Sequence, residues 1–307
     1  MDNGVVTSLF DGDELETIAA TGNRTAGYGR APATFGELLQ GVLGIDVKPF
    51  LVSLPIRSYS IAAFYTRPAV CGIGVFPPHK SKAKRLAEIF LKHHDLSIGG
   101  DIIFSCDVPE GKGLASSSAD MVATARAIIA RAGLEEDGSL LQRLMSEIEP
   151  SDPVMYSSVV AYHHVSGEII DVLGPPPQLV IVGLDAGGCI DTLEYNAVGH
   201  TFGGIDSVEY AKLLDKVRLA LRQNDCRALG AVATRSAELN QRRNPHRLWQ
   251  LAQRLAREGG AIGIAAAHSG TYLGLLFSPR QERFRERLRY VQLELERCNE
   301  ISKLFFT

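Results

Sequence analysis

The chain has few cysteines, and the five present are too few and too widely spaced for a disulfide framework. They contain no Cys-x-x-Cys pair, which excludes a standard zinc knuckle. No apolar run approaches the ~20 residues that span a bilayer. The N-terminus lacks the basic and apolar regions of a signal peptide. We therefore expect a protein of the reducing cytoplasm with no membrane partner.

A surplus of positive charge is also lacking. The net charge is −3 over 307 residues, whereas nucleic-acid-binding proteins usually carry a basic surplus, so no nucleic-acid partner is expected. Small phosphorylated ligands remain open, because backbone N–H groups can bind a phosphate without bulk positive charge. Hydrophobic residues make up 45% of the chain, enough for a sizeable core, and the 30 glycines are informative through their placement.

At about 150 residues per domain, the length predicts two domains or one large one. Residues 1–28 are polar and predict an N-terminal extension, followed by one lobe over 29–177 and a second over 178–307. The rigid stretch Gly174–Pro177 marks the boundary. Alternating helical and strand patterns indicate an α+β fold. Helices are predicted over 82–94, 116–132, 140–148, 208–223, 226–242, 248–258 and 282–298, with Ser81 capping the first and Pro245 opening 248–258; strands are predicted over 50–56, 58–65, 101–108, 168–173, 179–184, 262–267, 271–277 and 302–306.

The densest chemical signal is the small-residue loop Pro109–Ser118, between a predicted strand and a long alanine-rich helix. Free N–H groups at a helix N-terminus form an anion site, and glycines let the backbone approach a phosphate closely. Serine hydroxyls can bind a phosphate or Mg²⁺. Alternatively, Ser116 or Ser117 only caps the helix, but a cap does not explain three consecutive serines.

Standard phosphate and metal motifs do not fit. A Walker A loop would need Gly at position 106 and Ser or Thr at 113, where the chain has Cys106 and Gly113. The dinucleotide fingerprint would need Gly in place of Ser116, and the protein-kinase motifs are missing. The pairs His93-His94 and His163-His164 lack metal-binding spacing, so no metal is expected there.

The loop resembles the second motif of the GHMP kinase superfamily, which has the form Pro-x-x-x-Gly-Leu-x-Ser-Ser-(Ser)-Ala. Gly36–Gly41 resembles the first motif and Ala265–Thr271 the glycine-rich third, in the same order along the chain. The resemblance implies a two-lobed α+β GHMP kinase fold. Its N-terminal lobe would be similar to ribosomal protein S5 domain 2 and its C-terminal lobe ferredoxin-like, with ATP and acceptor meeting in the cleft between them.

Finer features resemble the L-threonine kinase family of cobalamin biosynthesis; they lie in Pro32–Gly41, Glu149–Asp152, Asp185–Thr192 and Ser236–Gln241. This resemblance implies ATP- and Mg²⁺-dependent phosphorylation of a small hydroxy amino acid, with L-threonine as first candidate. The alternatives are a homoserine-kinase-like or secondary-metabolite kinase, and a catalytically inactive relative that binds a nucleotide or ligand. The oligomeric state is left open, a homodimer included.

The same resemblance assigns the ATP-binding residues. Ser117 would ligate Mg²⁺, although three adjacent serines leave the register open. Lys112 either adds positive charge near the phosphates or is simply solvated. The residues that would hold the ATP phosphates are Gly111, Lys112, Gly113, Leu114, Ala115, Ser116, Ser117 and Ser118.

Asp152 is the candidate catalytic residue, because an aspartate at this position of the family would accept or polarise the hydroxyl proton. It could instead form a turn before Pro153. The threonine-kinase pattern has Asp-Gly here, so Pro153 puts the acceptor-side geometry in question.

Residues of the acceptor site are also carried over from the resemblance. A charged residue in an apolar, strand-like stretch is costly unless used or paired, so Glu37 either faces the substrate, holding an ammonium group, or forms a salt bridge. The third-motif turn would support the phosphate loop and acceptor, or merely pack. Asp191 and Thr192 either bind substrate or cap the next helix. The full set is Glu37, Asp191, Thr192, His268, Ser269 and Gly270.

Overall fold

The computed structural model describes residues 26–67, 72–188 and 204–307. Most of the predicted extension, and the acceptor candidates Asp191 and Thr192, lie outside the described residues. The elements in chain order are β1 (Ala26–Leu43), β2 (Lys48–Thr66), β3 (Ile73–Phe76), α2 (Ser81–His93), β4 (Gly100–Cys106), α3 (Ser116–Ala132), α4 (Gly138–Ser146), β5 (Val159–His163), β6 (Glu168–Gly174), β7 (Val180–Asp185), α6 (Gly204–Gln223), α7 (Cys226–Gln241), α8 (Trp249–Gly259), β8 (Gly263–Ala266), β9 (Tyr272–Phe277), α9 (Phe284–Arg297) and β10 (Ser302–Phe306).

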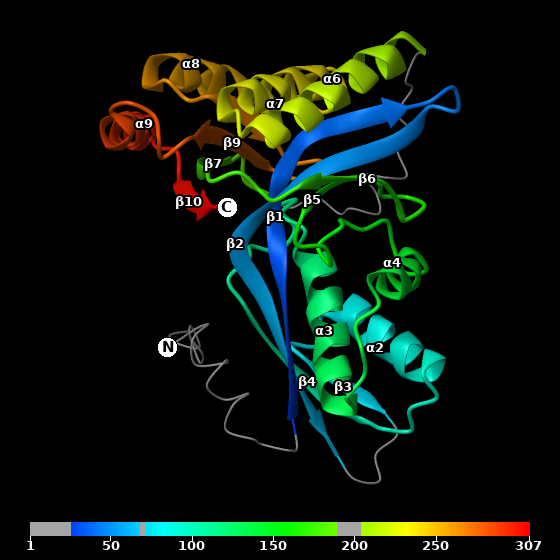
Figure 1. The fold of residues 1–307 in the computed structure, drawn as a ribbon. Coiled ribbons are helices and arrows are strands. Elements are labelled where there is room, and N and C mark those ends of the chain that lie inside the picture. The colour runs from blue at the N-terminus through cyan, green and yellow to red at the C-terminus, as the bar shows by residue number, and fades with distance from the viewer. Residues whose placement is uncertain (1–25, 68–71, 189–203) are drawn as a thin grey trace, which may run out of the picture.

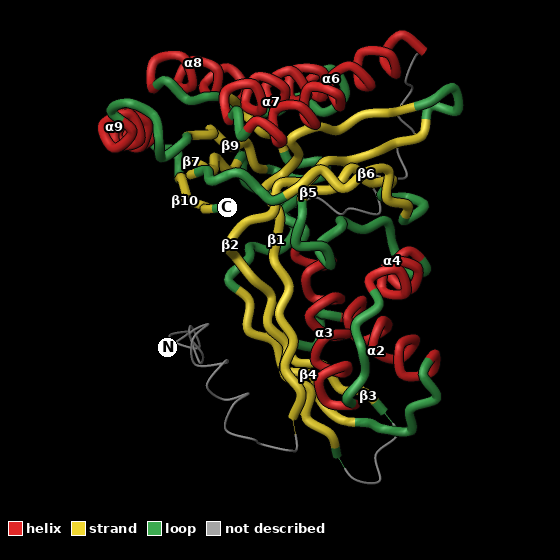
Figure 2. Tube along the Cα trace, in the orientation of Figure 1, coloured by secondary structure: helices red, strands yellow, loops and turns green. Residues whose placement is uncertain are grey.

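Two long antiparallel strands, β1 and β2, run through both lobes (Figure 1). They lie at the centre of a sheet with the strand order β10-β7-β9-β8-β1-β2-β4-β3, and the hairpin of β5 and β6 pairs with β2. Helices α2, α3 and α4 pack beside the β1, β2 and β4 end of the sheet, whereas α6, α7 and α8 cover the other end (Figure 2). The predicted α+β class and two lobes are therefore present, and strands of the first lobe continue into the second.

Helix α3 is the central element of the first lobe. Its apolar residues face the sheet on one side and α2 and α4 on the other, so most of its 17 residues are buried. Alanines let it approach both neighbours closely. Because its N-terminus begins directly after the Pro109–Ala115 loop, the packing of α3 fixes where that loop lies.

Most predicted helices and strands are confirmed, and α3 has the predicted bounds. The strands predicted over 50–56 and 58–65 are one strand, β2, because the chain continues its pairing with β1 through a register shift near residue 57. Residues 26–28 belong to β1 rather than to an extension, since they pair with β2. Strands β1, β3 and β5 were not among the predicted strands, although Glu37 was assigned to a strand-like stretch; β3 and β5 are short.

Two predicted helix starts are wrong. Helix α2 begins at Ser81 itself, with Lys80 at the N-cap position and no side-chain cap bond. Helix α8 begins at Trp249, so Pro245 lies before the helix rather than in its first turn. Among the described residues, no helix combines the length and apolar character needed to cross a membrane.

Candidate active site

A pocket of about 300 Å³ lies where the three motif regions meet. Its walls come from β1, the first turns of α2 and α3, the segment 149–152, the turn between β8 and β9, and the loop Pro109–Ala115, which is named the phosphate loop after its predicted role. Predicted site residues that line it are Glu37, Gly111, Gly113, Leu114, Ala115, Ser116, Ser117, Ser118, Asp152, His268 and Ser269. The lining residues that sequence reasoning gave no role include His79, Lys80, Lys82, Glu110, Asp120, Glu149 and His164.

Backbone contacts join the three motifs. The Thr34 N–H donates to Leu114 O at 3.2 Å, and the Thr271 N–H donates to Lys112 O, also at 3.2 Å. Gly113 has φ +76°, and a Cβ on it would lie 2.7 Å from the Cα of Gly270. No larger side chain fits at this crossing. Gly270 therefore packs against the backbone of the phosphate loop. It does not line the pocket.

The phosphate loop ends in a free helix N-terminus. Ala115 is the N-cap residue of α3, in the left-handed conformation, and no side chain caps the helix. The alternative that Ser116 or Ser117 serves only as a cap is therefore wrong. Helix α2 also begins without a side-chain cap, and neither helix has an acidic residue in its first turn. Both free N-termini line the pocket, which favours an anionic ligand.

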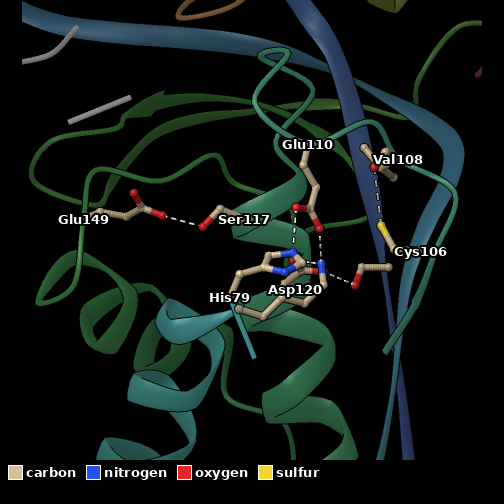
Figure 3. A network of polar contacts seen from close by, with 9 residues as sticks. His79, Cys106, Val108, Glu110, Ser117, Asp120 and Glu149 are labelled. Carbon is tan, nitrogen blue, oxygen red and sulfur yellow. Dashed lines mark hydrogen bonds and ion pairs between the residues drawn. The ribbon is translucent and has the colours of Figure 1, made fainter. Parts of the chain in front are cut away.

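The three serines have different surroundings. The Ser117 hydroxyl donates to Glu149 Oε1 at 2.6 Å (Figure 3). The Ser118 hydroxyl accepts the Asp152 N–H at 3.1 Å, and Ser116 lines the pocket. Ser117 and Glu149 together offer a hydroxyl and a carboxylate, oxygen ligands that Mg²⁺ prefers alongside substrate phosphates and water. No group of three or more His, Cys, Asp or Glu side chains suited to a metal occurs in the described ranges. The pair thus fits a cation that a nucleotide brings with it.

A buried lysine ties the phosphate loop to both helices. Lys80, whose side chain is 4% exposed, contacts Glu110 of the loop at 2.8 Å and Asp120 of α3 at 2.5 Å. His79 contacts the other oxygen of Glu110 at 2.9 Å (Figure 3), and Ser60 donates to Asp120. Although burial raises the pKa of Glu110, its bonds to the two basic residues lower that pKa below its usual range. The loop is therefore clamped in place by charge.

Lys112, predicted to lie near the phosphates or to be solvated, forms an ion pair with a residue of β7. Its ammonium contacts Asp185 Oδ2 and Gly188 O, both at 2.7 Å, at the end of β7. Thr271 also donates to Asp185 at 2.5 Å. Although burial raises the pKa of Asp185, these bonds hold it below its usual range. Lys112 does not line the pocket, and its contact with phosphates stays a prediction.

On another wall of the pocket, a bulge in β1 turns Glu37 inward. The β1–β2 register shifts on both sides of Glu37, and Gly36 adopts φ +53° against Ala266 of β8. Glu37 is 2% exposed, and its Oε2 has no hydrogen-bond partner. Burial, followed by the charge of Asp152, raises the pKa of Glu37 well above its ordinary value. Among the described residues no cation pairs with Glu37, so the salt-bridge alternative is wrong.

Asp152 lies beside Glu37, with the Ser53 hydroxyl 3.5 Å from its Oδ1. Its own N–H is used by Ser118, so Pro153, which lacks an N–H, leaves this anchor intact. Burial, and then the charge of Glu149, raises the pKa of Asp152 to about 6. A carboxylate with this pKa is deprotonated at neutral pH and suited to accept a proton.

Two imidazoles, of His164 and His268, also line the pocket. His268 and His164 lie edge to face with ring centroids 5.0 Å apart, and His268 Nδ1 lies 2.9 Å from Gln40 Oε1. Burial, with the neighbouring His163, lowers the pKa of His164 to about 4, so its ring is neutral near pH 7. Its buried Nδ1 has no partner. Sequence reasoning missed His164 because adjacency to His163 said nothing about which ring faces a cavity.

Known proteins are similar to this chain in sequence and in fold. The family model described as GHMP kinases N terminal domain matches residues 81–157. The chain is 29% identical over 257 residues to L-threonine kinase from Salmonella typhimurium (strain LT2), covering 82% of this chain and 83% of that one. It is 27% identical over 249 residues to L-threonine kinase from Citrobacter freundii, covering 80% and 85%. The fold is similar to homoserine kinase from Cytophaga hutchinsonii ATCC 33406, with a TM-score of 0.72 and 14% identity over 93% of this chain and 96% of that one.

The matched segment contains the phosphate loop, α3 and Asp152, and the structural likeness extends over both lobes. The expected fold, with an N-terminal lobe similar to ribosomal protein S5 domain 2 and a ferredoxin-like C-terminal lobe, is confirmed. In sequence and in fold the chain is similar to the GHMP kinases, and residues 81–157 match the model of their N-terminal domain.

Proposed function

We propose that the chain is an ATP-dependent kinase that phosphorylates the hydroxyl group of a small amino acid, with L-threonine as first candidate. One observation carries the proposal: a single pocket is lined both by the uncapped N-terminus of α3 and by two adjacent carboxyl groups, Glu37 and Asp152. The similarity to the two L-threonine kinases supports the choice of acceptor.

The first step is to hold the phosphates. The N–H groups at the start of α3 and the loop Gly111–Ala115 would surround them, as phosphoryl transfer depends mainly on positioning and charge stabilisation. Ser117 and Glu149 would hold Mg²⁺, which when bound supplies positive charge against the phosphate oxygens. Lys80 keeps the loop in position through Glu110.

The acceptor would bind beside Glu37. Glu37 lines the pocket and its buried Oε2 has no partner, so a substrate ammonium group would supply the missing hydrogen bond. Asp152 would then accept the proton of the acceptor hydroxyl as the oxygen attacks the terminal phosphate and ADP leaves. His164 and His268, which also line the pocket, would contact the acceptor's remaining polar groups.

A homoserine-kinase-like acceptor choice and a catalytically inactive relative are the alternatives. An inactive relative would need neither a proton acceptor with a pKa near 6 nor a loop held by the ion pair of Lys80 and Glu110. The choice of acceptor among hydroxy amino acids rests on the similarity to the two L-threonine kinases.

The test is ADP release from ATP and Mg²⁺ across a panel of L-threonine, L-serine, L-homoserine, mevalonate and sugars. We expect L-threonine to give the highest kcat/KM, and Asp152→Asn to lower turnover by about 10²–10⁴-fold while ATP still binds. Glu168→Gln, at an exposed carboxylate on β6, is the matched control. No turnover above background with any hydroxy amino acid would refute the proposal.

A further inference from the structure

Three basic residues lie where α2 begins, at the helix end where positive charge is unfavourable. His79, Lys80 and Lys82 precede or open the helix, no acidic residue occupies its first turn, and no side chain caps it. All three line the pocket, and His79 and Lys80 contact Glu110 of the phosphate loop. Basic residues at a helix N-terminus weaken the helix unless an anion pairs with them.

Lys80 and Lys82 differ in how firmly they are held. Lys80 is 4% exposed and lies between two carboxylates, so it is fixed. Lys82 is 35% exposed and contacts one carboxylate, with its Nζ 2.5 Å from Glu149 Oε2. Its flexible four-carbon side chain can therefore turn into the pocket without leaving a second partner unpaired.

Glu149 links Lys82 to the cation site. Its side chain is 3% exposed, and its two oxygens have separate partners: Oε1 accepts the Ser117 hydroxyl, and Oε2 contacts Lys82. A buried carboxylate needs a positive partner, and Lys82 supplies it in the nucleotide-free chain. A divalent cation on the same carboxylate would satisfy that need and would repel the ammonium beside it.

We propose that Lys82 is a phosphate-binding residue that is paired with Glu149 until a divalent cation binds. The cation displaces Lys82 from Glu149, and the released ammonium binds the nucleotide phosphates. This inference rests on the proposed function and adds an ordered exchange to it. The pocket gains a positive charge on the phosphates only when the cation is present, so a nucleotide without its metal binds weakly. Lys80 stays in place throughout.

The exchange predicts opposite effects of one substitution on two binding constants, both measured by calorimetry on the full chain. Lys82→Met leaves Glu149 free, so Mn²⁺ alone binds the nucleotide-free variant severalfold more tightly than wild type. The same variant loses a charged contact to phosphate, so it binds Mg²⁺ with a non-hydrolysable ATP analogue about tenfold more weakly. Lys84→Met is the matched control, because Lys84 is an exposed lysine two residues further along the same helix.

A second variant keeps the test decisive if Lys82→Met unfolds. Glu149→Gln releases Lys82 without a cation, so this variant binds metal-free ATP in EDTA more tightly than wild type and loses Mn²⁺ binding. A plain structural ion pair would instead weaken or leave unchanged every binding constant in either variant.

The exchange would be refuted if Lys82→Met binds the ATP analogue as tightly as wild type does, or if its affinity for Mn²⁺ is no higher than that of wild type. It would also be refuted if Glu149→Gln binds metal-free ATP no more tightly than wild type does. A wild-type chain that binds no nucleotide under any condition refutes the proposed function itself, and this result is separate from a failed exchange.

Discussion

Replacing Glu37 with glutamine should stabilise the folded chain and weaken acceptor binding. The substitution keeps the volume of a side chain that is 2% exposed and removes a carboxylate with one unpartnered oxygen. A buried carboxylate that ionises costs more than a neutral amide of the same volume, so we expect a gain of about 1–3 kcal/mol at pH 8, or roughly 2–10 °C in Tm. Loss of the bond to a substrate ammonium should lower kcat/KM for L-threonine by about 10–100-fold.

The stability gain should depend on pH. The folded-state pKa of Glu37 lies above its ordinary value of 4.5, so folded Glu37 retains a proton that the unfolded chain releases. Wild-type stability therefore declines as pH rises from about 4.5 through the folded pKa, and the glutamine variant lacks this decline. Its advantage should be small near pH 4 and full in alkaline buffer, measured by thermal unfolding at several pH values. A variant that is less stable at every pH, yet uses L-threonine normally, would show that Glu37 is structural.

Three further predictions concern the proton acceptor, the cation ligands and the lysine that holds the phosphate loop. Asp152→Asn should lower kcat by about 10²–10⁴-fold while ATP binding is kept. In the wild type, kcat/KM should fall on the acid side at or below about pH 6, because protonation of Asp152 removes the base; a cation on Glu149 would lower the Asp152 pKa. Ser117→Ala should raise the Mg²⁺ concentration for half-maximal activity by about tenfold, a shift that extra Mg²⁺ reverses. Lys80→Met leaves Asp120 buried without its cation and should destabilise the chain by about 3 kcal/mol in denaturant titrations, whereas Lys84→Met should not.

Local signals predicted the helices and the phosphate loop well. Helix α3 follows from a long alanine-rich stretch directly after glycines, and such a pattern has one plausible structure. The convergence of the first, second and third motifs could be expected from their order and glycine content. The structure supplies the physical reason: the second and third motifs meet where Gly113 packs against Gly270, and a side chain on Gly113 would not fit there.

Long-range pairings could not be predicted in the same way. The partner of Glu149 is Ser117, 32 positions earlier, and that of Lys80 is Asp120, 40 positions later, so no local pattern reports either contact. One signal was available: basic residues at the predicted start of α2 oppose the helix dipole, which marks them for another role. The partner of Lys112 also depended on tertiary packing, since Asp185 reaches it only through the pairing of β7 with β9.

The most direct test of the central claim is to identify the product formed from ATP and L-threonine. The chain, ATP, Mg²⁺ and L-threonine are followed by phosphorus NMR, and the product is treated with hydroxylamine. The account predicts a phosphate monoester on the threonine hydroxyl that resists hydroxylamine, requires Mg²⁺, and is missing with Asp152→Asn. ADP formed at the same rate without L-threonine, or a hydroxylamine-sensitive acyl phosphate, would contradict it.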